Sequence, residues 1–253
     1  MRGFHLLAGF LAILIHALFI LPAQANEAMA DAVLVLAIDA SDSIDAGEFQ
    51  TQIEGTADAL THSDVIAAIQ SGPLRRVAIS YVIWAESGAP KLIGEWHMVS
   101  DRETASRLAS DLRFAKRSVS GTTGLGSGIS ASISHLRNSG VVSTRFIIDV
   151  SGDGRETRGV RGLNSMPLKN ARNLATELGI TINGLAIENS EAGLASWYRE
   201  RVAAGPGNFV MKVGSMDEYG TAIRLKLIRE LNSTPLMAAR LPHSCGLAAN
   251  DAG

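Results

Sequence analysis

The stretch A-V-L-V-L-A-I runs from Ala32 to Ile38 and is followed at once by D-A-S-D-S, from Asp39 to Ser43. An apolar run of this length without polar alternation is typical of a strand buried on both faces, as in a parallel sheet covered by helices. The oxygen-bearing side chains begin where that strand ends. In open α/β sheets, ligands bind at the carboxyl ends of the strands, so this junction predicts both the fold class and the place of a site.

Further apolar runs predict the rest of the sheet. The other expected strands cover residues 76–84, 91–98, 146–150, 180–187 and 209–213. The segment from Lys91 to Met98 is more mixed in character and follows the second strand closely, so we expect it to be an antiparallel edge strand.

Helical patterns alternate with these runs. The first expected helix follows a cap at Asp45, and two others begin at the capping boxes Ser100–Glu103 and Ser215–Glu218. Apolar stripes at helical spacing predict three more, over residues 129–136, 168–178 and 194–198. Regular alternation of strands and helices predicts one doubly wound, mainly parallel α/β domain with right-handed crossovers.

The two ends of the chain differ from this domain. Residues 1–25 are expected to be a signal peptide, because an apolar stretch from Phe4 to Leu21 precedes the small-x-small pattern Ala23-Gln24-Ala25. The domain then covers residues 26–232, and residues 233–253 form a C-terminal tail without a clear pattern. We expect a periplasmic or secreted protein that meets the membrane only during export. Retention of the apolar stretch as an N-terminal membrane anchor is the alternative.

Composition excludes several functions. The 253 residues include 23 Lys and Arg against 25 Asp and Glu, a formal net charge of −2, so no strong field attracts nucleic acid or an anionic membrane. The single cysteine, Cys245, excludes an internal disulfide framework and a cysteine-rich metal site. No P-loop is present, and the glycines from Gly124 to Gly128 lack the strand and the acidic residue of a dinucleotide fingerprint. We therefore expect no nucleotide.

Three segments are rich in oxygen ligands. They are Asp39–Ser43, the stretch G-T-T-G from Gly121 to Gly124, and the stretch S-G-D-G from Ser151 to Gly154. Carboxylates and hydroxyls on flexible turns are the ligands that a hard divalent cation prefers, which predicts a site for Mg²⁺ or Mn²⁺.

These segments resemble the von Willebrand factor type A (vWA) domain, whose metal-ion-dependent adhesion site (MIDAS) is built from three loops. D-A-S-D-S matches the family's DxSxS motif, and the segments at Thr123 and at Asp153-Gly154 resemble its second and third loops. The resemblance covers Ala32 to Leu231. The stretch W-Y-R-E-R-V-A-A-G-P-G-N-F-V, starting at Trp197, is similar to a group of exported bacterial vWA-domain proteins of uncharacterised role. The implied sheet has strand order 3-2-1-4-5-6.

The resemblance also implies a role for each site residue. Ser41 and Ser43 would bind the metal directly, Thr123 directly or through water, and Asp39 and Asp153 mostly through bound waters. One position would stay open for a carboxylate from a partner protein. The alternative for the first loop is simple capping of the following helix.

Several positions leave a choice. Either Thr122 or Thr123 could face the metal, with the spacing favouring Thr123, and Asp149 is a rival to Asp153. An unpaired charge at Asp149 would be costly inside a buried strand, so we expect it to have a partner. Asp42 is expected to point to solvent or to cap the following turn. The first glycine of S-G-D-G departs from the family pattern.

The expected function is binding and not catalysis. A hydroxyl-rich site is poor at lowering the pKa of bound water, and no Gly-x-Ser-x-Gly nucleophile elbow is present. The alternatives are a metal-dependent phosphoester hydrolase and a structural exported domain with a silent metal site. Arg155, Arg158 and Arg161 either surround the metal with positive charge or form a solvated loop.

Overall fold

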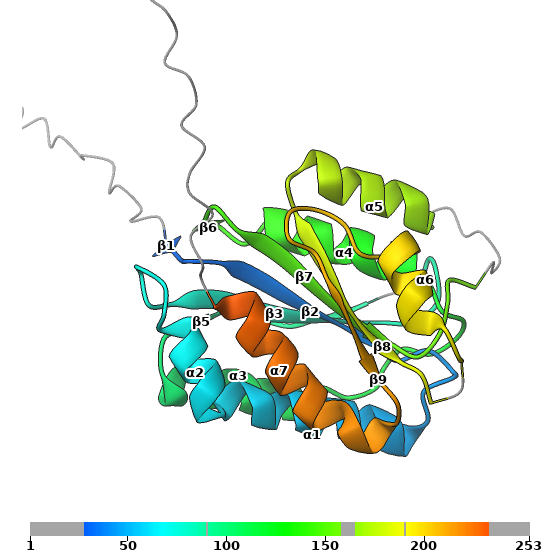
Figure 1. The fold of residues 1–253 in the computed structure, drawn as a ribbon, viewed down its shortest axis with the longest axis horizontal. Helices are drawn as coiled ribbons and strands as arrows, with labels where there is room; N and C mark the ends of the chain where they lie inside the picture. The colour runs from blue at the N-terminus through cyan, green and yellow to red at the C-terminus, as the bar shows by residue number, and fades with distance from the viewer. Residues whose placement is uncertain (1–27, 90, 158–164, 190, 233–253) are drawn as a thin grey trace, which may run out of the picture.

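The computed structural model describes residues 28–89, 91–157, 165–189 and 191–232 (Figure 1). The expected signal peptide, the tail with Cys245, and Arg158 and Arg161 lie outside these residues. Among the residues that are described, no helix is both long and apolar enough to cross a membrane.

A seven-stranded sheet forms the centre of the domain. Its strands are β2 (Val33–Asp39), β3 (Val77–Trp84), β4 (Leu92–Ile93), β5 (His97–Val99), β7 (Phe146–Gly152), β8 (Thr181–Ile187) and β9 (Val210–Val213). The order is β4-β3-β2-β7-β8-β9, with β5 also paired to β3. Strands β3, β2, β7, β8 and β9 are parallel, whereas β4 and β5 run antiparallel to β3. The predicted order 3-2-1-4-5-6 and the antiparallel edge are confirmed.

The edge strand predicted from Lys91 to Met98 is two short strands, β4 and β5. Gly94 lies between them against the ring of Tyr81, where a Cβ atom would come within 2.4 Å of Tyr81 Cε1. Its backbone N–H donates to Tyr81 O at 3.0 Å, and its carbonyl accepts from Ser80 Oγ at 2.9 Å. The chain therefore stays attached to β3 while it leaves the regular ladder.

Within the described residues, seven α-helices flank the sheet. They are α1 (Ala46–Thr61), α2 (Ser63–Ile69), α3 (Arg102–Phe114), α4 (Leu125–Arg137), α5 (Leu168–Glu177), α6 (Leu194–Arg201) and α7 (Tyr219–Leu231). Helix α2 was not predicted, and neither was a separate parallel pair formed by β1 (Ala28–Met29) and β6 (Val141–Val142).

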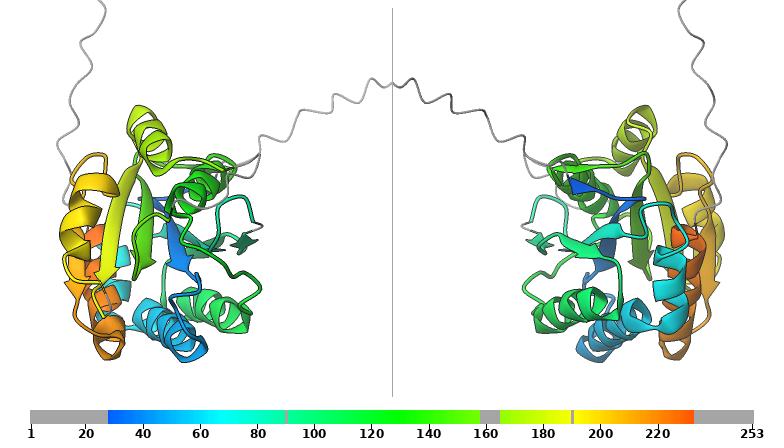
Figure 2. Two further views of the ribbon diagram at one scale, coloured as in Figure 1. Left: turned by 90° about the vertical axis from the view of Figure 1, so that its right-hand side faces the viewer. Right: turned by 90° about the vertical axis from the view of Figure 1, so that its left-hand side faces the viewer.

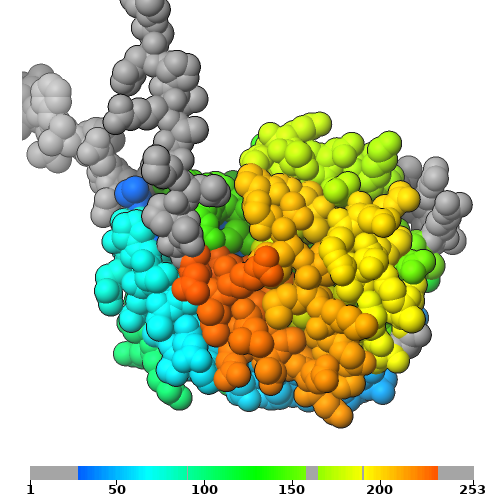
Figure 3. Space-filling model, viewed as in Figure 1, coloured from blue at the N-terminus to red at the C-terminus, as the bar shows by residue number. Residues whose placement is uncertain are grey.

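The two faces of the sheet carry different helices. Leu34, Leu36 and Ile38 of β2 face one core with α1, α2, α3 and α7, whereas Val33 and Val35 face the other with α4, α5 and α6. Figure 2 shows these two helical layers on opposite sides of the sheet. The space-filling view shows α7 beside α2 on the surface (Figure 3). Alternate residues of one strand thus fill separate cores, which explains the unbroken apolar run.

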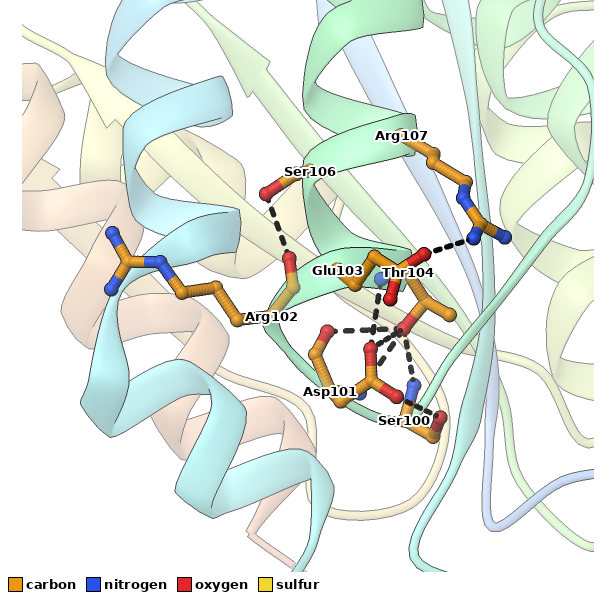
Figure 4. Close-up of polar contacts among 7 residues, drawn as sticks. All are labelled: Ser100, Asp101, Arg102, Glu103, Thr104, Ser106 and Arg107. Atoms are coloured by element: carbon orange, nitrogen blue, oxygen red, sulfur yellow. Dashed lines mark hydrogen bonds and ion pairs between the residues drawn. The ribbon is translucent and has the colours of Figure 1, made fainter.

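Helix starts differ in detail from the sequence pattern. The N-cap of α3 is Asp101, one residue after the predicted Ser100 (Figure 4). Asp101 Oδ1 accepts from the backbone N–H of Thr104 at 2.8 Å, and Thr104 Oγ1 accepts from that of Asp101 at 3.1 Å. The box predicted at Ser100–Glu103 is therefore wrong by one residue, because the neighbouring Asp101 offers an equally good cap. The cap predicted at Asp45 is confirmed, with Glu48 completing its box.

The second predicted box also differs. Ser215 precedes a 3₁₀ turn, Met216–Glu218, and its side chain makes no capping bond. The Glu218 side chain instead accepts from the backbone N–H of Gly214 at 3.0 Å, and α7 begins at Tyr219. This helix ends at Leu231.

Candidate metal centre

Three loops meet at the carboxyl edge of the sheet, next to the adjacent central strands β2 and β7. Asp39 ends β2, and its Oδ1 accepts from the backbone N–H of Ser41 at 2.8 Å. This bond turns the chain sharply, so that the hydroxyls of Ser41 and Ser43 lie 3.2 Å apart. Capping of α1 is done by Asp45, so Asp39, Ser41 and Ser43 do not serve as its cap.

The third loop joins the first through a side chain. The Ser43 hydroxyl donates to Asp153 Oδ1 at 2.6 Å. Asp153 follows the end of β7 by one residue and is buried. Parallel neighbours β2 and β7 therefore bring both aspartates to one edge, as their positions after apolar runs predicted.

The second loop contributes Thr123. Its hydroxyl donates to Ser41 Oγ at 3.4 Å, and its carbonyl accepts from the backbone N–H of Thr157 at 2.9 Å. Thr122 is exposed, whereas Thr123 is buried. Of the two threonines, Thr123 is the one that faces the other oxygen atoms. The five residues predicted for the site thus form one connected cluster: Asp39, Ser41, Ser43, Thr123 and Asp153.

The cluster places two carboxylates where water is scarce. Burial raises the pKa of Asp39 from its ordinary 3.8 to about 7, against the lowering effect of the hydrogen bonds from Ser41. Burial also raises the pKa of Asp153, against the hydrogen bond from Ser43. Oδ2 of Asp39 and Oδ2 of Asp153 are both buried without a hydrogen-bond partner. A buried carboxylate oxygen without a partner costs free energy, and a bound cation would offset that cost. The two acids therefore fit a cation site.

Asp42 and Arg117 hold the first loop in place through hydrogen bonds that involve backbone groups. Asp42 Oδ1 accepts from the backbone N–H of Gly121 at 2.8 Å, and the Asp42 N–H donates to Gly121 O, also at 2.8 Å. Arg117 donates to the carbonyls of Ala40 and Ser41 at 3.1 and 2.9 Å. Asp42 is exposed, as expected, and its side chain in addition fastens the second loop to the first.

Glu156 fastens the third loop to α4. Its Oε2 accepts from the backbone N–H of Gly126, in the first turn of that helix, at 2.9 Å. Burial raises the pKa of Glu156, although the hydrogen bond from the backbone N–H of Gly126 acts to lower it. Sequence analysis missed Glu156 and Arg117, since neither lies in a recognisable motif. Both act on backbone groups that only the folded chain brings near them.

Asp149 lies in a different cluster. It points into the core between β7 and α7, where Lys226 Nζ lies 2.5 Å from its Oδ1 and 2.6 Å from Glu230 Oε1. Asn183 Nδ2 also donates to Glu230 Oε1 at 2.8 Å. The expectation that this buried carboxylate has a partner is confirmed, and the partner is a fully buried lysine.

Arg155 is paired with an acid of a neighbouring loop. Its Nε lies 2.7 Å from Glu191 Oε1, and its backbone N–H donates to Glu191 Oε2 at 3.3 Å. Among the described residues, no group of three or more His, Cys, Asp or Glu could hold a metal ion. The candidate centre at Asp39 therefore depends on hydroxyl groups as well as on its two acids.

This architecture is that of a vWA domain. The proximal thread matrix protein 1 of the mussel byssus has a similar fold, with a TM-score of 0.56, 16% identity, and coverage of 79% of this chain and 48% of that one. A von Willebrand factor type A protein from Catenulispora acidiphila gives 0.55, 12%, 80% and 43%, and the pilus adhesin SpaC from Lactobacillus rhamnosus GG gives 0.53, 12%, 80% and 31%. The match thus spans half or less of the length of these relatives. The mussel protein has also been solved with a zinc-occupied MIDAS motif.

The chain belongs to the family described as Protein of unknown function (DUF1194), whose model matches residues 29–235. A search of curated proteins finds no match.

Proposed function

We propose that this protein is an exported, divalent-metal-dependent binding module of the adhesion type. Ser41, Ser43 and Thr123, with Asp39 and Asp153, would hold a Mg²⁺ or Mn²⁺ ion, and a partner protein would offer a carboxylate to it. The observation that carries the proposal is the convergence of these five side chains from three separate loops.

The donor set fits a hard cation. Both partnerless oxygens, on Asp39 and Asp153, belong to carboxylates whose charged form is opposed by burial. A bound cation would compensate that charge, and Mg²⁺ takes oxygen ligands in preference to nitrogen or sulfur. The hydroxyls of Ser41, Ser43 and Thr123 already share hydrogen bonds, so they are held close together before any ion arrives.

The same donors favour binding over catalysis. When bound, the ion supplies a positive centre that attracts a carboxylate. With Asp39 and Asp153 acting mostly through bound waters, the direct protein ligands would be neutral hydroxyls, which would keep the attraction of the ion for an incoming anion strong. Hydrolysis would instead require ligands that lower the pKa of a metal-bound water, which neutral hydroxyl groups do poorly. An adhesin and a matrix protein are among the proteins of similar fold.

Export is the second part of the proposal. It is supported by the apolar stretch from Phe4 to Leu21 and by the small-x-small pattern that follows it. We propose a periplasmic or secreted protein, cleaved after Ala25. The N-terminal sequence of the protein recovered from its cells tests this: a start at Asn26 supports cleavage, and a start at Met1 contradicts it.

Metal titration tests the binding part. Calorimetry with Mg²⁺ and Mn²⁺ should give saturable heat, and the melting temperature should rise with metal and fall back with EDTA. Asp39→Asn should abolish both effects. Asp217→Asn, which alters an exposed acid in the turn before α7, is the control and should bind as the wild type does.

Two other outcomes would each replace the proposal. Absence of heat and of any thermal shift in the wild-type protein would indicate a structural domain with a silent site. Turnover on a panel of phosphoesters, lost in Asp39→Asn, would indicate a hydrolase.

A further inference from the structure

Tyr198 of α6 lies in a slot at the end of the sheet, directly behind the candidate metal centre. The residue is fully buried. A Cβ atom on Gly184 of β8 would come within 2.8 Å of Tyr198 Cδ1, and one on Gly152 of β7 within 2.7 Å of the Tyr198 hydroxyl. The two glycines on neighbouring strands therefore leave the space that the ring and its hydroxyl occupy.

This slot explains the unexpected glycine of S-G-D-G. The same Cβ position on Gly152 lies 2.8 Å from Asp39 Oδ2. The hydroxyl of Tyr198 and the partnerless oxygen of Asp39 thus occupy adjoining space, which any other residue at position 152 would fill. Gly152 lies in strand β7 and does not have a positive φ, so its backbone conformation does not require glycine. Glycine is required here because a side chain would not fit.

The Tyr198 hydroxyl carries a proton that it can donate to the loops. In the structure it donates to the carbonyl of Gly154 at a long 3.5 Å. Burial raises the pKa of Tyr198 well above its ordinary value, and the nearby charges of Asp39 and Asp153 raise it further. The group therefore stays neutral at any physiological pH and remains a donor.

We infer that Tyr198 is a positioning residue of the candidate metal centre, whose hydroxyl orients the inner oxygen of Asp39 and holds the third loop at Gly154. The inference rests on the proposed metal binding and adds a residue from outside the three loops. Its long bond to Gly154 leaves the hydroxyl free to turn to the neighbouring Asp39 Oδ2, which has no hydrogen-bond partner. Hydrogen bonds to metal-binding side chains from behind typically change metal affinity 10–100-fold.

The test compares Tyr198→Phe with Tyr219→Phe. Phenylalanine keeps the ring in the slot and removes only the hydroxyl. Tyr219 is also fully buried, but its hydroxyl faces Thr56 and Ser151. In calorimetric titrations with Mn²⁺, Tyr198→Phe should lower affinity about 10-fold or more, whereas Tyr219→Phe should leave it unchanged. The melting temperature of the metal-free protein should change by a similar small amount in both variants.

Ultraviolet difference spectra give a second, spectroscopic readout. The chain contains three tyrosines, and Mg²⁺ does not absorb in the tyrosine band. Addition of Mg²⁺ should produce a tyrosine difference signal that disappears in Tyr198→Phe and persists in Tyr219→Phe.

Full-strength Mn²⁺ binding by Tyr198→Phe would overturn the inference while leaving the proposed function intact. A lower melting temperature with unchanged affinity would show a structural role only, and would overturn it equally. If the wild-type protein gives no heat with either metal, the proposed function fails and the inference fails with it.

Discussion

The hydroxyl of Ser43 donates a 2.6 Å hydrogen bond to the carboxylate of Asp153, across 110 residues of sequence. This bond connects the loop after β2 to the loop after β7. Strands β2 and β7 are parallel neighbours at the centre of the sheet, so the two loops leave the same edge side by side (Figure 1). Strand order thus creates the site, and the Ser43–Asp153 bond fixes its geometry.

Ser43→Ala removes that bond and one hydroxyl of the cluster. We expect Mg²⁺ affinity to fall at least about 10-fold, because the hydroxyl that would bind the metal is lost and the Asp153 side chain is free to turn away. The free energy of unfolding of the metal-free protein should fall by only about 1 kcal/mol, the usual cost of one hydrogen bond. Calorimetry and urea unfolding measure the two effects. Ser134→Ala, which alters an exposed serine near the C-terminal end of α4, is the control and should leave metal affinity unchanged.

Loss of the buried Lys226 side chain of α7 should lower the free energy of unfolding strongly. Lys226→Met leaves Asp149 and Glu230 facing each other without a positive charge, so we expect a loss of about 3–5 kcal/mol in urea unfolding. Arg107→Met is the control, because Arg107 pairs with Glu103 at the surface, where a salt bridge contributes about 0–1 kcal/mol. Equal effects of the two substitutions would show that burial of Lys226 carries no special cost.

The same cluster predicts a pH dependence. Burial, with the neighbouring charge of Asp149, raises the pKa of Glu230 from 4.5 to about 8 in the folded protein. The folded state therefore keeps a proton that the unfolded state releases above pH 4.5. Because the unfolded state then binds fewer protons, the contribution of Glu230 to stability falls as pH rises from 4.5 towards about 8.

Glu230→Gln should remove this contribution. Glutamine keeps an oxygen for Asn183 and Lys226 but cannot ionise. Urea unfolding of both proteins across this pH range should show a shallower decline in the variant, by up to about 1.4 kcal/mol per pH unit. Parallel curves for the two proteins would mean that Glu230 does not hold the buried proton.

The slot around Tyr198 predicts a specific rescue. Gly152→Ala should destabilise the protein by about 1–3 kcal/mol, since the new methyl group meets the Tyr198 hydroxyl and Asp39 Oδ2. In a Tyr198→Phe background this cost should shrink, because the hydroxyl is gone. Gly184→Ala should cost the same in both backgrounds, because its methyl group meets ring carbon Cδ1, which phenylalanine keeps. Double-mutant cycles measure this difference, and equal rescue of the two alanine variants would contradict the geometry of the slot.

Most of the fold could be predicted because its signals are local. Unbroken apolar runs such as Ala32–Ile38 mark strands with helices on both sides, and the polar residues just after them mark the edge where ligands bind. The five predicted site residues lie together because parallel neighbours β2 and β7 end at the same edge, and because α4 begins beside them. Short elements were harder. Helix α2 and strands β1 and β6 are too short to show a period.

The residues that sequence analysis missed or misplaced act through contacts between distant segments. Arg117 donates to carbonyls 76 and 77 residues away, and Asp42 binds the backbone of Gly121. Nothing in the stretches around them has a period or a motif that signals those partners. The extra glycine at position 152 of β7 departs from the family pattern because of Tyr198, which lies on the distant helix α6. Ser100 and Asp101 are both good N-caps, so a local pattern could not choose between them.

The most direct test of the metal centre is a crystal structure grown with Mn²⁺, with anomalous diffraction recorded to locate the ion. We predict one strong anomalous peak among the hydroxyls of Ser41, Ser43 and Thr123, next to Asp39 and Asp153. A map with no peak at this edge of the sheet, in crystals that contain Mn²⁺, would contradict the proposed site.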